Sequence, residues 1–333
     1  MDKKPFGTVN GQQIYAYSIS EKDLTATIID YGAALQSLAF DGAPVILGYG
    51  SAQEYARNDG YMGATVGRYA NRIRGAKFTL DGCEYLLNAN DGTNALHGGE
   101  KGFHTVIWKV VEHTNNSIEL EYFSKDGEEG FPGNLTTRVK YKIADNALII
   151  NLWAKTDKPT PVNLTNHTFF NLNGKGEITN HEMTVYAEKF VELSEDYAPS
   201  GRLLNVENTP LDFRKEKRIG KDILSTHKQM QIAGGFDQFF VIDGQGLRKA
   251  VSVRSKESGI KMDCYTDCDG VLFYSGNYLT DREGTSGKIS FRNGFCLEAH
   301  GYPNAVNVSH FPSPVIRENQ EYNKTIEYRF SKI

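Results

Sequence analysis

The stretch Asn163–Leu172, NLTNHTFFNL, is the part of the chain from which the fold and the site are best predicted. At the two-residue period of a β-strand, its side chains fall on two faces. One face is apolar and can pack into a core: Leu164, Phe170 and Leu172. The other carries amides, a hydroxyl, an imidazole and an aromatic ring: Asn163, Thr165, His167, Phe169 and Asn171. Because this face has no Lys or Glu, it predicts contact with a polyhydroxylated ligand, although a strand beside a polar loop would also account for it.

Short runs of strand-favouring residues continue on both sides, broken by Gly, Asn, Asp and Pro. We predict strands over Gln13–Tyr17, Leu24–Ile29, Ala34–Phe40, Trp108–Val111, Ile118–Phe123, Thr136–Ile143, Ala147–Trp153, Glu182–Val185, Gln238–Ile242, Ala250–Arg254, Lys261–Tyr265, Val271–Tyr274, Lys288–Phe291 and Lys324–Phe330. Asp41-Gly42 and Asp81-Gly82 are typical of turns between strands. Helical periodicity is confined to Ser51–Ala56 and Asp222–Gln231. We expect loops over Ser124–Asn134, Leu193–Leu203 and Thr280–Lys288. This pattern predicts an all-β sandwich or barrel with few short helices.

Composition restricts the class of protein further. The chain has 333 residues, is 39% hydrophobic and shows no linker or repeat, so we expect a single domain over residues 1–333. Its net charge of −4 argues against nucleic acid and against an anionic membrane surface as partners. The N-terminal residues lack an apolar signal region, and no apolar run approaches the ~18 residues of a membrane span, which favours the cytoplasm. Four cysteines are too few for a disulfide framework, so we expect reduced thiols.

Two motifs ahead of the opening stretch carry polar groups suited to sugar hydroxyls. In Gly67–Ile73, GRYANRI, Arg72 offers a rigid fork of donors and Asn71 adds an amide. In Leu96–Gly99, LHGG, two glycines after His97 let the backbone approach a ligand closely. Taken singly, each motif is also explained by an ordinary turn.

Two later motifs place carboxylates in apolar surroundings. Asp237 lies in GGFDQF, where it would have to accept either from a backbone amide or from ligand hydroxyls. Glu298 follows an apolar triplet in Phe295–Asn304, FCLEAHGYPN. A carboxyl buried in this way has a raised pKa and is a candidate general base. A buried ion pair, for example with Arg72, is the alternative.

Metal and covalent chemistry find little support in the sequence. The candidate ligands show no close two-histidine spacing such as HExxH: His97, His104, His167 and His300. There is no GxSxG motif, and no cysteine stands beside a histidine in an evident pair. We therefore expect neither a metal nor a cofactor.

The motifs together resemble the aldose 1-epimerase (galactose mutarotase) family. They come in the order GRYANRI, LHGGxxGF, PVNLTNHTFFNL, FDQFF, SGNYL and FCLEAHGYPNAVN, and the resemblance runs from about Gly7 to Phe330. It implies a large antiparallel β-sandwich with an open cleft. It also implies metal-free, cofactor-free acid–base interconversion of the α and β anomers of free hexoses, by a monomer or homodimer.

Residue by residue, the resemblance makes His167 the general acid and Glu298 the general base. A carboxylate near His167 should help it keep its proton at neutral pH. Sugar hydroxyls and the ring oxygen would be held by Asn71, Arg72, His97 and Asp237, while Phe169 stands where the family often has Tyr.

The chain departs from many relatives at Leu272 and at His300, both of which we expect at the rim of the sugar. Three alternatives remain on the same kind of fold. A non-catalytic carbohydrate-binding protein would most naturally have lost His167 or Glu298. An epimerase for a phosphorylated hexose would need cations in the cleft beyond Arg72. A glycoside-cleaving sandwich would use two carboxylates, which Asp237 and Glu298 could supply.

Overall fold

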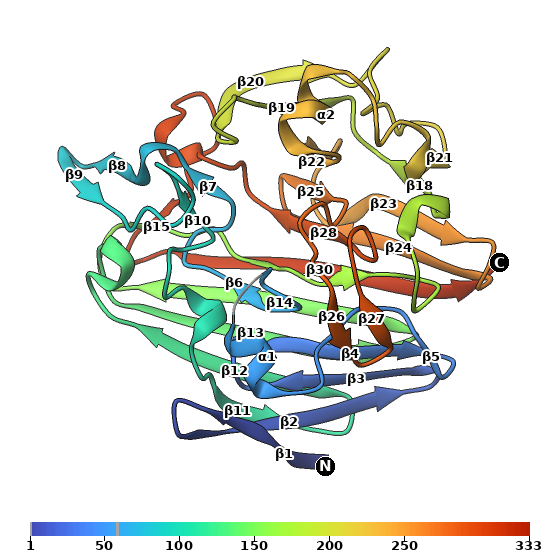
Figure 1. Cartoon of the computed structure of the whole chain (residues 1–333). Coiled ribbons are helices and arrows are strands. Elements are labelled where there is room, and N and C mark those ends of the chain that lie inside the picture. Colours follow the sequence, from blue (N-terminus) through green and yellow to red (C-terminus); the bar gives the residue numbers. More distant parts are fainter. Residues whose placement is uncertain (1, 58–59) are drawn as a thin grey trace.

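A nine-stranded antiparallel sheet forms the base of the molecule (Figure 1). The structure is a computed structural model that describes residues 2–57 and 60–333. In spatial order the strands are β11 (Lys109–His113), β12 (Ser117–Ser124), β13 (Leu135–Ala144), β14 (Ala147–Thr156), β30 (Glu321–Lys332), β24 (Ile260–Thr266), β23 (Arg248–Ser255), β18 (Glu182–Val185) and β21 (Lys217–Arg218). In β13, buried Val139 and Tyr141 alternate with outward Arg138 and Lys140, so one face is solvated and the other must be covered.

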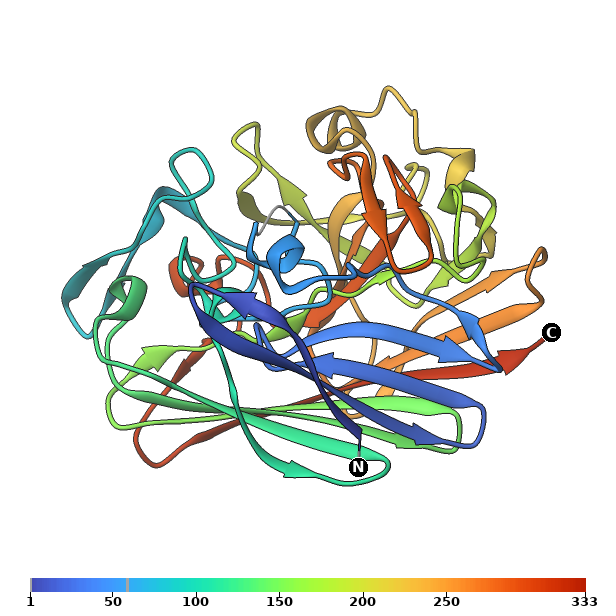
Figure 2. The ribbon, with the colours of Figure 1, turned by 60° about the horizontal axis from the view of Figure 1, so that its bottom comes forward.

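Two smaller antiparallel sheets cover that inner face. The five-stranded sheet has the order β1 (Asp2–Val9), β2 (Gln12–Glu21), β3 (Leu24–Ile29), β4 (Ala34–Phe40) and β5 (Ala43–Pro44). The six-stranded sheet has the order β17 (Phe169–Phe170), β28 (Phe295–His300), β25 (Gly270–Tyr274), β22 (Asp237–Val241), β19 (Lys189–Leu193) and β20 (Pro199–Asn205). One apolar core joins residues from all three sheets, such as Ile28, Tyr141 and Phe273. This confirms the predicted all-β sandwich, which Figure 2 shows from a second side.

Short elements connect these sheets. The two-stranded ladders are β6 (Thr65–Val66) with β16 (Thr165–Asn166), β7 (Arg72–Ile73) with β10 (Ala95–Leu96), β8 (Lys77–Leu80) with β9 (Cys83–Leu86), β15 (Thr160–Pro161) with β29 (Val315–Ile316), and β26 (Arg282–Gly284) with β27 (Gly287–Ile289). The described residues form two α-helices, α1 (Ala52–Ala56) and α2 (Lys228–Ala233). The 3₁₀ turns are η1 (Arg74–Ala76), η2 (Phe103–Thr105), η3 (Glu128–Gly130), η4 (Ile178–Asn180), η5 (Ile219–Lys221) and η6 (Ala305–Asn307). Across the described residues, no helix is long and apolar enough to cross a membrane.

Most predicted strands are confirmed, and β3, β4 and β18 have the predicted bounds. The turns at Asp41-Gly42 and Asp81-Gly82 are also confirmed. Both residues of each pair have positive φ, which the tight turn between two antiparallel strands requires (51° and 75°, 49° and 81°).

Several predicted boundaries are wrong. The helix begins at Lys228 rather than Asp222, because the His227 side chain accepts a hydrogen bond from the Gln229 amide and caps it there. The expected loop over 193–203 contains the start of β20, an edge strand in which Pro199 is tolerated. The expected loop over 280–288 contains β26, and β27 ends at Ile289 instead of continuing to Phe291.

The stretch 163–172 is not one continuous strand. It changes partners: β16 pairs with β6, and β17 pairs with β28. Its apolar face packs into the core as predicted. The polar face is divided, because Asn163, Thr165 and Asn171 bond backbone groups while His167 and Phe169 line a cavity.

Arg68 anchors the segment that leads to β7. Its guanidinium is buried, with the side chain 2% exposed, and donates to the carbonyls of Pro132 and Gly133 at 2.8 and 3.0 Å and to Thr160 Oγ1 at 3.2 Å. Burial lowers the pKa of Arg68 to about 10. Arg68 therefore fastens residues 67–73 to the surface loop at 124–134 instead of facing a ligand.

Replacing Arg68 by Met should destabilise the fold, because several buried acceptors would lose their donor at once. We expect the free energy of unfolding in urea to fall by about 3 kcal/mol or more. The matched Arg138→Met variant, on the solvated face of β13, should lose at most about 1 kcal/mol. Equal losses in the two variants would show that the Arg68 network adds no stability of its own.

Candidate active site

A cavity of about 170 Å³ brings all seven predicted site residues together. The predicted residues that line it are Asn71, Arg72, His97, His167, Phe169, Asp237 and Glu298. The other lining residues are Gly60, Tyr61, Leu96, Leu272, Tyr274, Tyr278 and Leu279. The roles given to the seven residues stay predictions.

The register of the six-stranded sheet builds the floor of this cavity. Paired residues in adjacent strands project from the same face, as do residues two apart in one strand. Leu272 pairs with Glu298, and Tyr274 pairs with both Cys296 and Asp237. Phe169 pairs with Cys296 on the other side of β28. The carboxyl groups of two strands and the ring of Phe169 are therefore aligned on one surface.

Two turns hold Asn71 and His97 against each other. Both have left-handed backbone conformations, with φ of 65° and 53°. The Asn71 amide donates to His97 Nδ1 at 3.2 Å, and the His97 amide donates to the Asn71 carbonyl at 3.2 Å. Burial lowers the pKa of His97 well below its usual value, so the ring is neutral. Because Nδ1 accepts, Nε2 carries the proton and is a hydrogen-bond donor.

Arg72 is held by a carboxylate that the sequence interpretation missed. Its Nε donates to Asp91 Oδ2 at 2.6 Å, while its Nη1 lies 4.0 Å from Asp237 Oδ2. Burial disfavours the charge on Arg72, but Asp237 and Asp91 outweigh burial and raise its pKa. Glu298 forms no ion pair with Arg72 among the described contacts, so Arg72 is wrong as the example of a partner for Glu298.

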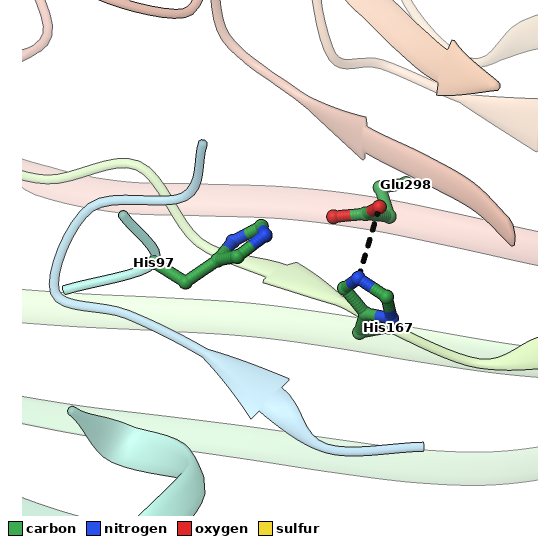
Figure 3. Close-up of side chains that lie close together, drawn as sticks. All are labelled: His97, His167 and Glu298. Atoms are coloured by element: carbon green, nitrogen blue, oxygen red, sulfur yellow. Dashed lines mark ion pairs between the residues drawn. The ribbon is translucent and has the colours of Figure 1, made fainter. Parts of the chain in front are cut away.

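His167 and Glu298 point toward each other across the cavity, with His97 beside them (Figure 3). His167 Nε2 lies 3.4 Å from Glu298 Oε1, and the two side chains are 6% and 1% exposed. The buried Oε2 of Glu298 has no hydrogen-bond partner among the described residues. The pair thus has one oxygen free for a ligand.

Burial sets the protonation of this pair. It raises the pKa of Glu298 well above its usual value, with the Asp237 charge adding to the shift. It lowers the pKa of His167 to about 4. The expectation that a carboxylate would keep His167 protonated is therefore wrong for this buried geometry, because desolvation outweighs the attraction. Both pKa shifts favour a proton on Glu298 over one on His167.

A cysteine does lie beside this histidine, contrary to the sequence interpretation. Cys296 Sγ is 3.5 Å from His167 Nδ1. The thiol is fully buried, and burial raises its pKa well above the usual range, so it is not a nucleophile. The sequence places Cys296 two residues before Glu298, but it does not show that His167 lies against both side chains. All four cysteines are unpaired, as predicted.

Three tyrosines that the sequence analysis did not name as site residues complete the wall of the cavity: Tyr61, Tyr274 and Tyr278. The ring of Tyr61 lies 4.6 Å from that of His97 and 5.6 Å from that of His167, centroid to centroid. Tyr274 accepts a hydrogen bond at its hydroxyl from the Tyr278 amide at 2.8 Å. Tyr274 and Tyr278 flank or belong to the SGNYL motif, so the motif could have indicated them.

The two departures from the family pattern have different locations. Leu272 lines the cavity next to Glu298, as expected. His300 does not line it, because its position on β28 is opposite Gly270 and its ring stacks on Phe239 at 4.9 Å. The expectation that His300 is at the rim is therefore wrong.

Three side chains come close enough to be considered as metal ligands: His97, His167 and Glu298, whose ligand atoms lie within 4.8 Å of one another. Nδ1 of neutral His97 is occupied by the Asn71 amide, however, which leaves Nε2 protonated and without a lone pair for a metal. The remaining two groups are fewer than the three protein ligands of a catalytic zinc site. This donor chemistry favours the prediction that no metal takes part, which stays a prediction.

The fold and the cavity together define a β-sandwich with a buried carboxyl–imidazole pair and further hydrogen-bonding groups around it. Comparison with known sequences gives the particular family. A sequence model of the family Aldose 1-epimerase matches residues 15–329. The chain belongs to the aldose 1-epimerase family.

Relatives of similar length are found among characterised proteins and solved structures. Galactose mutarotase from Bos taurus is 38% identical over 325 residues, 95% of this chain and 93% of the relative. Aldose 1-epimerase from Escherichia coli K12 is 34% identical and covers 92% of both chains. The crystal structure of a GalM/aldose epimerase homologue from C. elegans has a TM-score of 0.89 at 30% identity, covering 96% of this chain and 99% of the other.

The protonation of His167 can be measured directly. Its imidazole should stay neutral down to about pH 5, because burial lowers its pKa from about 6.5 to about 4. Titration of its ring proton resonances by NMR, assigned with the His167→Asn variant, would test this. A midpoint near 6.5 would mean that the ring is solvated or that Glu298 stabilises its charge fully.

Proposed function

We propose that this protein interconverts the α and β anomers of free hexoses by opening and reclosing the sugar ring. The observation that carries the proposal is the 3.4 Å contact between His167 Nε2 and Glu298 Oε1 at the floor of the cavity. Anomer exchange needs one group to take the C1 hydroxyl proton and another to protonate the ring oxygen. The names of the relatives, galactose mutarotase and aldose 1-epimerase, support the same activity.

In the mechanism we propose, Glu298 is the general base and His167 the general acid. Ring opening begins from ionised Glu298 and protonated His167, which form when the shared proton moves to the imidazole beside the bound sugar. Glu298 takes the C1 hydroxyl proton while His167 gives its Nε2 proton to O5. This step leaves the pair as protonated Glu298 and neutral His167, the form that burial favours. Rotation about C1–C2 and the reverse transfers then close the other anomer. Each positioned group typically contributes about 10²–10⁴-fold.

The remaining site residues are proposed to hold the sugar. Arg72 is fixed by Asp91 and offers its Nη atoms to hydroxyls. His97 offers Nε2–H, and Asp237 offers carboxylate oxygens at the neighbouring strand. Phe169 supplies an apolar face, and Asn71 contributes by fixing His97.

The alternatives are less well supported by the site. Arg68, the other cation of the GRYANRI motif, donates to backbone carbonyls instead. Arg72 is therefore the Arg or Lys that lines the described part of the cavity. A single guanidinium supplies little positive charge for binding a phosphate group. A purely binding protein would have no use for a buried carboxyl next to a buried imidazole, which costs stability. A glycoside-cleaving site would need Asp237 as second carboxylate, and Arg72 faces that group instead.

We also propose the domain organisation, the location and the partner of the protein. We propose that residues 1–333 form one domain, since the family match extends over residues 15–329. We propose the cytoplasm as its location, in keeping with four unpaired cysteines. The proposed partner is a small sugar, bound by a monomer or a homodimer.

The Glu298→Gln variant should lose at least about 10²-fold in kcat with little change in KM, because the amide keeps the shape but cannot take a proton. Polarimetry on freshly dissolved α-glucose and α-galactose measures this. Glu327→Gln, a buried carboxyl on β30 paired with Arg329, is the matched control and should retain its kcat. Near wild-type kcat in Glu298→Gln would remove Glu298 from the base role.

We expect a tolerant enzyme, with kcat/KM for glucose and galactose within about tenfold, or about 1.4 kcal/mol. The two sugars differ in the direction of the C4 hydroxyl, and Leu272 gives the cavity no hydrogen bond where it lies. Leu272→Gln should change KM more than kcat, as measured by initial polarimetric rates on both sugars. A wild-type preference well above about a hundredfold would mean that a polar group such as Arg72 already fixes C4.

A further inference from the structure

Strand β28 contacts both nitrogens of the His167 ring. Cys296 and Glu298 are two residues apart, so their side chains project from the same face of the strand. The imidazole lies over that face, with Nδ1 3.5 Å from Cys296 Sγ and Nε2 3.4 Å from Glu298 Oε1. The strand thereby determines both the position of the ring and the chemical group that each nitrogen meets.

The thiol at Nδ1 is a neutral partner. Cys296 is fully buried between Phe169 and Tyr274, its register partners in β17 and β25. Burial raises the pKa of the thiol well above its usual value. A neutral thiol is a weak donor and a weak acceptor, so it can accept from an N–H without bringing a charge to the ring.

The proposed proton transfers require one particular tautomer of neutral His167. When C1–O5 breaks, its electron pair goes to O5, and O5 takes the proton from Nε2. The proton that remains on the ring must then be on Nδ1. On reclosure Nε2 must accept the O5 proton, which a neutral ring protonated at Nε2 could not do.

We propose that Cys296 is a positioning residue, whose sulfur accepts a hydrogen bond from Nδ1–H of His167 and so keeps Nε2 as the nitrogen that exchanges protons with Glu298 and the sugar. This inference rests on the proposed function of the His167–Glu298 pair. Cys296 touches neither the sugar nor the exchanged proton in this arrangement. Its role is comparable to that of the groups that orient a histidine from its second nitrogen in other active sites.

The tautomer is measured by ¹⁵N NMR of histidine-labelled protein at neutral pH, independently of any activity. In the wild type, Nδ1 of His167 should show the shift of a protonated nitrogen and Nε2 that of an unprotonated one. In Cys296→Ala, the two shifts should move toward each other, because both tautomers become populated. In Cys296→Ser, whose hydroxyl can also accept, they should stay near their wild-type values. A protonated Nε2 in neutral wild-type His167 would overturn the proposal even if no variant folded.

Kinetics separate this role from simple packing. Cys264→Ala removes a sulfur atom from an equally buried position on β24, away from the cavity, and serves as the control. Cys296→Ala should lower kcat about tenfold or more relative to Cys264→Ala, with KM nearly unchanged, and Cys296→Ser should restore kcat to within about threefold of wild type.

Equal kcat in the two alanine variants, with wild-type ¹⁵N shifts in Cys296→Ala, would overturn the proposal. A wild-type protein that shows the predicted tautomer but catalyses no anomer exchange would overturn the proposed function instead, while supporting the contact between Cys296 and His167.

Discussion

The pairing of β28 with β17 on one side and β25 on the other is the constraint on which the site depends. It aligns Phe169, Glu298 and Leu272 in adjacent strands, so that one surface of the sheet carries the ring, the carboxyl and the apolar wall of the cavity. A shift of one residue in this register would turn Glu298 into the core and bring Leu297 to the cavity. The opposite face of β28 is bound into the main core by Phe295 and Leu297, which makes such a shift costly.

Burial favours the neutral form of the Glu298–His167 pair, and this limits the cost of burying the pair. Two separate charges with side-chain exposures of 1% and 6% would each pay a large desolvation penalty. A carboxylic acid beside a neutral imidazole avoids that penalty, and one proton moving between them produces the ionised form. Hydroxyl groups of a bound sugar can replace part of the lost hydration of the carboxylate, since Glu298 Oε2 has no hydrogen-bond partner in residues 2–57 and 60–333. The same proton then serves both the opening and the closing of the ring.

The sequence was sufficient for the sandwich class, because the two-residue period is a local property of each strand, as in β13. It was also sufficient for the seven cavity residues, because the order of the motifs resembles a family. It did not reveal the contact between Arg72 and Asp91, which lie in separate segments of the chain. It also did not reveal the contact between Cys296 and His167, which are distant in the chain and are brought together by the pairing of β17 with β28. The polar face of 163–172 was misjudged for a similar reason. Asn163 and Thr165 meet carbonyls of Gly301 and Ala299, which no local pattern could predict.

The position of β30 has a consequence for how this chain folds. Residues 321–332 form an interior strand of the nine-stranded sheet, with β14 on one side and β24 on the other. Until those residues leave the ribosome, β14 and β24 each present an unpaired edge, and the sheet is divided into two parts. Contacts between such distant segments are slow to form. A nascent chain of this protein therefore exposes two open strand edges until residues 321–332 have been synthesised, and unpaired edges of this kind promote aggregation.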